Sequence, residues 1–501
     1  MRHASLAIDP ARRIASVERR LFGSFVEHMG RCVYTGIYEP GHPRADVNGF
    51  RLDVLDLVRE LGVTVVRYPG GNFVSGYRWE DGIGPKSARP RRANLAWHSL
   101  ESNQFGIDEF ARWCAAAGVE PMLAINLGTR GALAATELME YVNLPAGTTT
   151  LADRRVANGA VNPYDVKLWC LGNEMDGPWQ LGHTSAHEYG RLAAQTAHAL
   201  RALTPDARLV VCGSSSWDMP TFGAWESAVL DETYDVVDMI SCHSYYQIQD
   251  GDRRSFLASG AHMDGFITAV TDLADGAAAR RRTRKRLTIS FDEWNVWDIV
   301  AWQEIPARTD WPEAPRLIED DYRLLDAVVI GGLLIALLRH ADRVAVACQA
   351  QLVNVIAPIR TEPGGLAWRQ ATFHPFALTS RHAYGDVLDV ALHADTHETR
   401  HGDVSLVDAI ATHDSDSGST AVYMVNRSID DAVEFAVDAR ALAAFRIEKA
   451  LTIAGPDLDA VNSRMQPNNV APRELEKIEI DGGRVTLVLP PASWTLLSLR
   501  H

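Results

Sequence analysis

Short apolar runs alternate with amphipathic stretches from about residue 18 to residue 383. The apolar runs predict strands at Leu21–Val26, Val63–Tyr68, Pro121–Asn126, Val166–Leu171, Leu209–Gly213, Val237–His243, Leu287–Phe291 and Arg343–Ala347. The stretches between them predict helices that include Arg51–Leu61, Ile107–Ala117, Ala186–Leu203, Gly265–Ala274 and Asp320–Arg339. Near-continuous apolar strands separated by helices are typical of parallel βα units, because helices cover both faces of a parallel sheet. Eight such units predict an α/β fold, a closed (β/α)8 TIM barrel.

Polar groups follow each of the predicted strands. They are Glu27-His28, Pro69-Gly70-Gly71-Asn72, Asn126, Asn173-Glu174, Ser214-Ser215-Ser216, His243-Ser244-Tyr245-Tyr246, Asp292-Glu293 and Gln349/Gln351. A doubly wound open sheet would concentrate such groups near one switch point. Their even distribution favours the barrel, with an active site at the carboxyl ends of its strands.

Beyond about residue 384 the chain changes to strand-like runs separated by short turns. These runs are Val404–Thr412, Thr420–Asn426, Ala432–Val437, Arg446–Ile453, Leu475–Ile480 and Val485–Leu489. The pattern predicts an antiparallel, all-β sandwich domain. The opening segment also looks strand-like and precedes the barrel. We therefore predict a barrel over residues 18–383 and a sandwich formed by residues 1–17 and 384–501.

Two glutamates stand at the ends of facing strands, Glu174 after the fourth and Glu293 after the seventh. A retaining glycosidase needs one ionised carboxylate as nucleophile and one protonated carboxyl group as acid, about 5–5.5 Å apart. Like charges at that distance discourage double ionisation, so one member of such a pair keeps its proton near neutral pH. Each glutamate alone could equally form a strand-end salt bridge. The two together predict glycoside cleavage.

Several neighbours fit a sugar pocket. Asn173 could donate to a sugar 2-hydroxyl, a bond that tightens in the transition state. Tyr245 could hydrogen-bond a nucleophilic carboxylate, although it could also be an ordinary tyrosine at the mouth of the barrel. Tryptophan rings suit the faces of sugars, and we expect some of the following four to act so and the rest to be core: Trp97, Trp179, Trp294 and Trp297.

Composition narrows the possible partners. The formal net charge of −15 disfavours nucleic acid and anionic membranes, and no signal-peptide core is visible, so we expect a cytoplasmic protein. The longest apolar run, Ala327–Leu338, is too short to cross a bilayer and predicts a packed helix.

The few cysteines lie mainly in apolar runs and predict buried thiols. His183 and His187 share a helical spacing but no third ligand is evident, so we expect no metal. Arg280–Arg286 predicts a solvated loop.

Five motifs together resemble the intracellular α-L-arabinofuranosidases of glycoside hydrolase family 51. They are Gly23–His28, Arg67–Phe73, Gly172–Trp179, Phe291–Trp297 and Ala350–Asn354. The resemblance runs nearly end to end and includes Asn462-Ser463 and Trp494. It implies a (β/α)8 barrel with a jelly-roll-like sandwich, often assembled as a hexamer, and no metal or organic cofactor.

The resemblance also implies residue roles. Glu174 is expected to be the acid/base and Glu293 the nucleophile of a retaining, exo-acting enzyme that releases terminal arabinofuranose from arabinan or arabinoxylan oligosaccharides. The residues that the resemblance implies for binding the innermost sugar are Glu27, Asn72, Asn173, Tyr245 and Gln351. To these we add Trp97, Trp179 and Trp297 as substrate contacts, on the ground given above that their rings suit the faces of sugars.

Three alternatives stay open from the sequence. A β-xylosidase or an endo-glucanase could use the same barrel and carboxylate pair, since a fold does not fix the sugar. A non-catalytic sugar-binding barrel and a metal-dependent barrel enzyme are the others. The rim segments Gln247-Ile248-Gln249 and Asp298-Ile299-Val300 depart from the family pattern, which leaves the preference for the leaving group undetermined.

Overall fold

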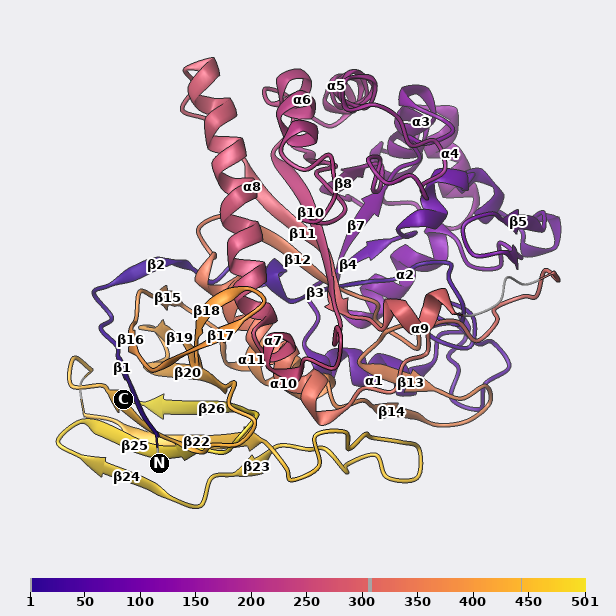
Figure 1. Cartoon of the computed structure of the whole chain (residues 1–501). Helices are drawn as coiled ribbons and strands as arrows, with labels where there is room; N and C mark the ends of the chain where they lie inside the picture. Colours follow the sequence, from indigo (N-terminus) through magenta and orange to yellow (C-terminus); the bar gives the residue numbers. More distant parts are fainter. Residues whose placement is uncertain (1, 305–308, 443) are drawn as a thin grey trace.

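The computed structural model describes residues 2–304, 309–442 and 444–501. Eight parallel strands close into a barrel in the spatial order β10-β11-β12-β3-β4-β7-β8-β9 (Figure 1). Their bounds are β3 (Gly23–Phe25), β4 (Val65–Tyr68), β7 (Glu120–Ala124), β8 (Leu168–Leu171), β9 (Arg208–Val211), β10 (Met239–Tyr246), β11 (Thr288–Val296) and β12 (Val344–Ala350). Each overlaps one predicted strand, so the predicted TIM barrel is confirmed.

Apolar side chains from most of the barrel strands fill its interior. The cluster contains Phe25, Val65, Met122, Ala124, Leu168, Cys170, Val210, Met239, Val346, Cys348 and Ala350. Because these side chains pack the barrel solid, the cup that is left for chemistry lies at the carboxyl ends of the strands. Strands β4 and β8 are buried along their whole length, as expected for a parallel sheet covered on both faces.

Helices surround the barrel. They are α1 (Leu52–Leu61), α2 (Ile107–Ala117), α3 (Ala132–Asn143), α4 (Thr150–Ala157), α5 (Ala186–Leu203), α6 (Ala224–Thr233), α7 (Arg253–Leu257), α8 (Ser259–Arg281), α9 (Ile299–Gln303), α10 (Leu324–Arg339) and α11 (Phe373–His382). The predictions for α2 and α5 are confirmed to the residue. Helix α8 is much longer than predicted and runs through Arg281, so the predicted loop at Arg280–Arg286 is wrong for its first two residues.

Helix α10 lies between the barrel and the β-sandwich, and it is buried from Leu324 to Leu338. This position explains why its apolar run has no polar stripe, and the predicted packed helix is confirmed. It begins at Leu324 rather than Asp320, because Asp326 accepts hydrogen bonds from the backbone N–H and the guanidinium of Arg323 and so caps the first turn. Among the described residues, no helix combines the length and the apolar content that crossing a membrane requires.

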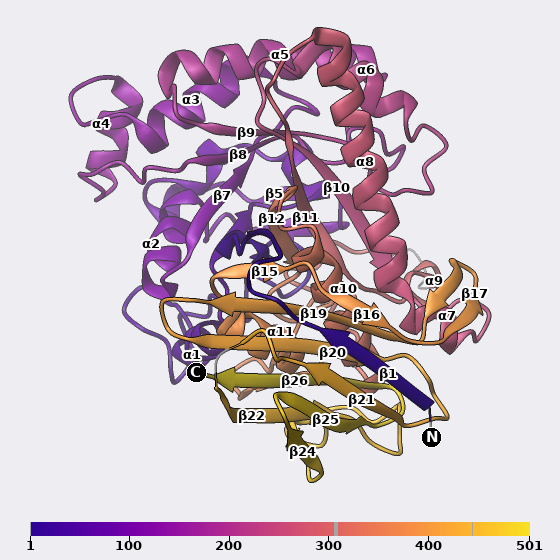
Figure 2. The ribbon, with the colours of Figure 1, turned by 90° about the vertical axis from the view of Figure 1, so that its left-hand side faces the viewer.

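Two packed sheets form the β-sandwich, which Figure 2 shows beneath the barrel. One sheet has the order β16-β1-β21-β25-β24 and the other β2-β15-β19-β20-β26-β22-β23. Their bounds are β1 (Arg2–Ala7), β2 (Arg13–Ser16), β15 (Asp386–Leu388), β16 (Ala391–His393), β19 (Val407–Asp414), β20 (Ser419–Asn426), β21 (Val433–Asp438), β22 (Arg446–Ile453), β23 (Arg473–Glu474), β24 (Ile478–Asp481), β25 (Arg484–Leu489) and β26 (Ser493–Arg500).

The opening segment does pair into this sandwich, since β1 lies beside β21 and β2 beside β15. The predicted strand Val404–Thr412 is divided in two: Leu406 separates β19 from β18 (Gly402–Ser405), which forms its own hairpin with β17 (Thr396–Thr399). Short hairpins are also formed by β5 (Arg92–Asn94) with β6 (Ser99–Glu101), and by β13 (Ile359–Thr361) with β14 (Ala367–Arg369). The exact domain boundaries stay a prediction.

Candidate active site

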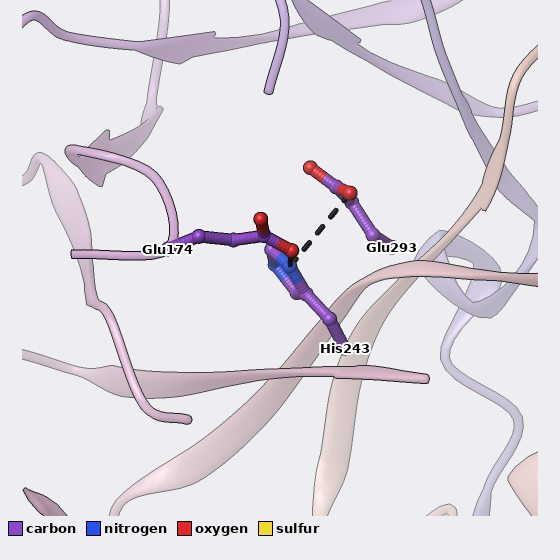
Figure 3. Close-up of side chains that lie close together, drawn as sticks. All are labelled: Glu174, His243 and Glu293. Atoms are coloured by element: carbon purple, nitrogen blue, oxygen red, sulfur yellow. Dashed lines mark hydrogen bonds and ion pairs between the residues drawn. The ribbon is translucent and has the colours of Figure 1, made fainter. Parts of the chain in front are cut away.

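Glu174 and Glu293 face each other across the carboxyl end of the barrel (Figure 3). Glu174 follows β8, whereas Glu293 lies within β11. They are buried, with exposed fractions of 8% and 5%, and one carboxylate oxygen of each lies within 4.8 Å of the other. The backbone φ of Glu174 is 44°, a left-handed conformation that costs a non-glycine residue free energy and often marks functional sites. The structure therefore brings the two predicted carboxylates together.

Hydrogen-bond donors hold both oxygens of Glu293. Arg67 Nη1 donates to Oε1 at 2.7 Å and the Tyr245 hydroxyl donates to Oε2 at 2.8 Å. Burial raises the pKa of Glu293 and the nearby charge of Glu174 adds to the rise, while His243, Arg67 and Tyr245 oppose it. The predicted contact between Tyr245 and a carboxylate is present, and both donors favour the ionised form of Glu293.

His243 connects the two sides of the site. Its Nδ1 lies 2.9 Å from Glu174 Oε1 and 3.7 Å from Glu293 Oε2, and its Nε2 lies 2.9 Å from Asp292 Oδ1. Burial lowers the pKa of His243, but the surrounding carboxylates outweigh burial and hold it well above its ordinary value. A doubly protonated imidazole therefore donates to Glu174 on one side and to Asp292 on the other.

Asp292 and Arg67 complete the buried charges. Burial on its own raises the pKa of Asp292, but the positive charge of Arg67 and the hydrogen bond from His243 outweigh it, so the pKa is lowered. Arg67 Nε lies 3.5 Å from Asp292 Oδ2, and Arg67 Nη2 donates to Asn173 Oδ1 at 2.7 Å. One guanidinium thus orients the carboxylate of Glu293 and the amide of Asn173 together.

The roles of Arg67, His243 and Asp292 were not predicted from the sequence. Neighbouring strand residues normally face opposite sides, so Asp292 is expected to point away from the cup if Glu293 points into it. The register of β11 against β12 shifts between Phe291 and Trp294, and that irregularity allows both acids to face inward. Arg67 could have been picked out from the sequence, because it is the one charged residue in the otherwise uncharged strand β4.

A second group of predicted residues surrounds Glu27. The backbone N–H of Phe73 and the indole of Trp97 both donate to Glu27 Oε1, at 2.9 and 2.7 Å, and Gln351 Nε2 approaches Oε2 at 3.4 Å. Burial outweighs these donors and raises the pKa of Glu27 to about 8. At neutral pH this carboxyl group is therefore protonated and can donate a hydrogen bond as well as accept one.

The glycines before Asn72 are explained by close approach to these carboxylates. A Cβ atom at Gly70 would lie 2.3 Å from Glu27 Cγ, and one at Gly71 would lie 2.9 Å from Glu293 Oε1. The two glycines therefore leave room for the side chains that line the cup. Asn72 Oδ1 lies 3.4 Å from Asn173 Nδ2, so both predicted asparagines reach the same place.

The four tryptophans lie in different surroundings. Trp179 is 53% exposed and donates to Glu174 Oε2 at 2.7 Å, which places its ring beside the carboxylate at the mouth of the cup. Trp297 is half-buried and packs edge-on against Tyr245. Trp97 is half-buried and binds Glu27. Trp294 is fully buried in the core, the place that was expected for some of the four.

Glu174, His243 and Glu293 also have the spacing of a metal-ligand set. The donors already described argue against that use, because each carboxylate oxygen of the pair has an N–H or O–H donor and His243 faces carboxylates with both nitrogens. His183 and His187 are both exposed, and the candidate set found in the described residues does not include them. The six cysteines are buried and free, as predicted.

Comparisons with known proteins agree over nearly the whole chain. Residues 57–261 match the model of an "Alpha-L-arabinofuranosidase 1 domain" and residues 292–493 that of an "Alpha-L-arabinofuranosidase C-terminal domain". The chain is 53% identical to an intracellular exo-α-(1→5)-L-arabinofuranosidase from Streptomyces lividans, over 99% of this chain and 75% of that protein. It is 52% identical to an exo-α-(1→6)-L-arabinofuranosidase from Bifidobacterium longum, over 100% and 98%.

Solved structures give the same result. A family 51 α-L-arabinofuranosidase from Bifidobacterium longum superposes with a TM-score of 0.96 at 48% identity, and each chain is covered completely. An α-L-arabinofuranosidase from Thermotoga maritima, solved in complex with arabinose, gives a TM-score of 0.88 at 32% identity, over 99% of this chain and all of that one.

Proposed function

Because the chain belongs to the family 51 α-L-arabinofuranosidases, we propose that it is an exo-acting, retaining glycoside hydrolase. It releases terminal non-reducing α-L-arabinofuranose from arabinan or arabinoxylan oligosaccharides. The observation that carries the proposal is the pair Glu174 and Glu293, with oxygens within 4.8 Å of each other and separate sets of hydrogen-bond partners. An inverting pair stands about 6.5–9.5 Å apart to admit a water molecule.

In the first step, a carboxylate oxygen of Glu293 attacks the anomeric carbon while Glu174 gives its proton to the glycosidic oxygen. The bond from the anomeric carbon to that oxygen breaks, the leaving alcohol departs, and a glycosyl ester with Glu293 remains. In the second step, Glu174 takes a proton from water, whose oxygen attacks the same carbon and frees Glu293. Two inversions give net retention of configuration.

Charge balance supports this division of roles. Arg67 and His243 supply two buried positive charges, which Asp292 and Glu293 balance when both are ionised. A third buried negative charge would lack a matching cation and would be costly. The charge count requires only that one member of the pair keeps a proton, and the donors Arg67 and Tyr245 favour Glu293 as the ionised member, which supports the role of Glu174 as the acid.

The polar groups that several strands bring to one cup bind the innermost sugar. Glu27, Asn72 and Asn173 follow β3, β4 and β8, Tyr245 lies in β10 and Gln351 follows β12, and their mutual contacts support a common role in binding that sugar. Convergence on a single sugar unit supports exo action at a chain end. The half-exposed Trp179 beside Glu174 supports a stacking role toward the leaving group.

Three further properties belong to the proposal. The relatives named intracellular support a cytoplasmic location and a role in L-arabinose metabolism on imported oligosaccharides. A homohexamer is proposed by resemblance and would be tested by light scattering after size-exclusion chromatography.

The named relatives differ in linkage, 1→5 and 1→6, so no linkage is carried over. Neither a metal nor an organic cofactor is needed for the two steps above.

Comparing nitrophenyl α-L-arabinofuranoside with nitrophenyl β-D-xyloside tests the proposal. We expect strong preference for the arabinofuranoside, together with chromatographic detection of arabinose from arabino-oligosaccharides. Proton NMR of the first-formed product should show the α-anomer. A higher turnover of the xyloside would favour the xylosidase alternative, and arabinose binding without turnover would favour a non-catalytic barrel.

A further inference from the structure

Asp292 is a buried carboxylate of the site that takes no part in the two steps described above. It is 1% exposed and precedes Glu293 in strand β11. Its Oδ1 accepts from His243 Nε2 at 2.9 Å, while its Oδ2 accepts from the Cys170 thiol at 3.3 Å and lies 3.5 Å from Arg67 Nε. Because a buried charge is costly, a carboxylate kept beside the reacting groups needs a reason other than stability.

Three carboxylates face His243: Glu174 from the loop after β8, and Asp292 and Glu293 from β11. Burial lowers the pKa of His243, but these carboxylates outweigh burial and hold the imidazole charged. Two of them change during the reaction, because Glu174 loses and regains a proton and Glu293 becomes an ester. Burial on its own would raise the pKa of Asp292, but Arg67 and His243 lower it, so Asp292 keeps its charge throughout.

The negative charge of the catalytic pair moves during the first step. Before that step Glu293 is ionised and Glu174 carries the proton, whereas afterwards Glu293 is a neutral ester and Glu174 is ionised. His243 Nδ1 lies 3.7 Å from Glu293 Oε2 and 2.9 Å from Glu174 Oε1, so one imidazolium adjoins the charge in both states (Figure 3). Arg67 donates to Glu293 and so stabilises the first state. Asp176 adds negative charge near Glu174, which makes a cation on that side more necessary.

We propose that Asp292 is a positioning residue of the hydrolysis, which acts through His243. Its hydrogen bond to Nε2 keeps this imidazole charged and aimed at Glu174, and the cation stabilises the carboxylate that Glu174 becomes after giving up its proton. That carboxylate is the base of the second step, in which it takes a proton from the attacking water. The proposal rests on the retaining arabinofuranosidase function proposed above.

Removal of the charge of Asp292 should change where a proton resides in the glycosyl-enzyme. His243 then lacks the anion that stabilises its charged form, so the proton between His243 and Glu174 should pass to Glu174. A protonated Glu174 cannot accept a proton from water. The second step should therefore slow down, and it should recover at a higher pH, where this proton is lost.

Dinitrophenyl α-L-arabinofuranoside isolates the second step, because its leaving group departs without a proton and makes the first step fast. The measurement is the pH at which kcat is half-maximal on the acid side, called here the acid midpoint. Asp292→Asn should raise the acid midpoint by about one unit, which is about a tenfold loss of kcat below it. Added azide, which attacks the ester without a base, should raise the kcat of the variant in that range.

A double variant and a matched control separate this role from a structural one. His243→Gln should also raise the acid midpoint, and Asp292→Asn in that background should raise it no further, because Asp292 acts through His243. Asp408→Asn is the control, since Asp408 is a buried aspartate of β19 that accepts from Arg339 and Arg427. It should lower the melting temperature and leave the acid midpoint unchanged.

Asp292→Ser is the second charge-removing variant, for use if Asp292→Asn gives no cooperative melting curve. An unchanged acid midpoint in a folded Asp292 variant, a kcat that azide does not raise, or a further shift in the double variant would overturn the role of Asp292. Failure of the unmodified enzyme to cleave any arabinofuranoside would instead overturn the proposed function on which this role rests.

Discussion

Between the two sheets of the sandwich, strands β1, β21 and β25 bring Leu6, Phe435 and Leu487 into a core of apolar side chains. At the carboxyl end of the barrel, Glu27, Arg67 and Glu293 are buried as deeply, with exposed fractions of 2%, 1% and 5%. The first arrangement removes apolar surface from water and stabilises the fold by about 25 cal/mol per Å². The second removes ionisable groups from water, which costs free energy unless partners compensate, as they do for Arg67 and Glu293, or the group stays protonated, as Glu27 does.

The difference indicates what each region is for. A core that only had to be stable would replace the buried charges by apolar side chains of the same volume, often with a gain in stability. The barrel end keeps them because attack, proton transfer and sugar binding need them in a dry site. Substitutions should therefore affect activity in one region and stability in the other, and the following predictions test that separation.

Glu293→Ala should have the largest effect. Without the carboxylate no glycosyl ester forms, so kcat should fall roughly 10⁴- to 10⁶-fold on every arabinoside. The free energy of unfolding, measured by urea titration, should change far less than the activity. Appreciable turnover by a carefully purified variant would contradict the role of Glu293.

Glu174→Ala should have a smaller effect that depends on the substrate. Proton transfer contributes about 10²- to 10⁴-fold, so natural oligosaccharides should lose that much. Nitrophenyl arabinofuranoside, whose leaving group needs no proton, should keep more of its glycosylation rate, and added azide should speed the second step. Equal losses on both substrates would remove Glu174 from the role of acid. Trp179→Phe, which deletes one donor to Glu174 but keeps a ring, is the matched control.

In the sandwich, Phe435→Ala should act on stability alone. Removing a fully buried phenylalanine costs about 3–5 kcal/mol of unfolding free energy, through lost transfer energy and the cavity left behind. The kcat of the folded variant should stay unchanged, because Phe435 belongs to the sandwich core cluster, which includes none of the site residues. Glu434→Ala, the half-exposed neighbour on the other face of β21, should change stability by less than about 1 kcal/mol.

The sequence predicted this division only in part. The strands of the barrel are short apolar runs that end in polar residues, and this pattern can be recognised in the sequence alone. Glu174 and Glu293 could be found for the same reason. Helix α6 was harder to find, because its buried face has helical spacing but includes the polar Glu226 and Thr233 beside Trp225, Val229 and Leu230.

The site partners were hidden for a different reason. The inward direction of Asp292 depends on an irregularity in the pairing of β11, which no local pattern announces. The role of His243 depends on Asp292 and on Glu174, which are distant from it in the sequence. Likewise, Trp294 and Trp297 look alike in the sequence, and only the fold shows that Trp294 is core and Trp297 borders the cup.

The pH dependence of stability should show the cost of a buried acid. Burial raises the pKa of Glu27 from 4.5 to about 8, so between these values the folded protein holds a proton that the unfolded chain releases. The contribution of Glu27 to stability should therefore be complete at low pH. It should decline as pH rises toward 8, by about 1.4 kcal/mol per pH unit.

Glu27→Gln removes this titration while keeping the shape of the side chain. The difference in unfolding free energy, unmodified protein minus variant, should fall steadily between pH 5 and pH 8 in urea titrations. Taking the difference cancels the titrations of His243 and Asp292, which both proteins share. The exposed Glu479→Gln is the control and should give a difference that does not change with pH. A flat difference for Glu27→Gln would show that the carboxyl group is ionised in the folded protein at pH 5 and above.

The smallest expected effect is that of a chelator. Glu174, His243 and Glu293 are close enough to bind one cation, as in metal-dependent barrel enzymes. Here, however, Arg67 and Tyr245 already donate to Glu293, and the raised pKa of His243 keeps a proton on each of its nitrogens. A cation would have to displace these donors and a proton, and it would also occupy the oxygen that attacks the sugar.

We therefore expect kcat and KM to be unchanged after dialysis against EDTA. Added Zn²⁺ should inhibit, most strongly at higher pH, where His243 loses its proton more readily and becomes a better ligand. His243→Gln should weaken that inhibition, since one of the three ligands is gone. Loss of activity in EDTA that Zn²⁺ restores would mean that the buried charges hold a metal ion. The barrel end would then differ from the sandwich by a bound metal as well as by its buried ionisable side chains.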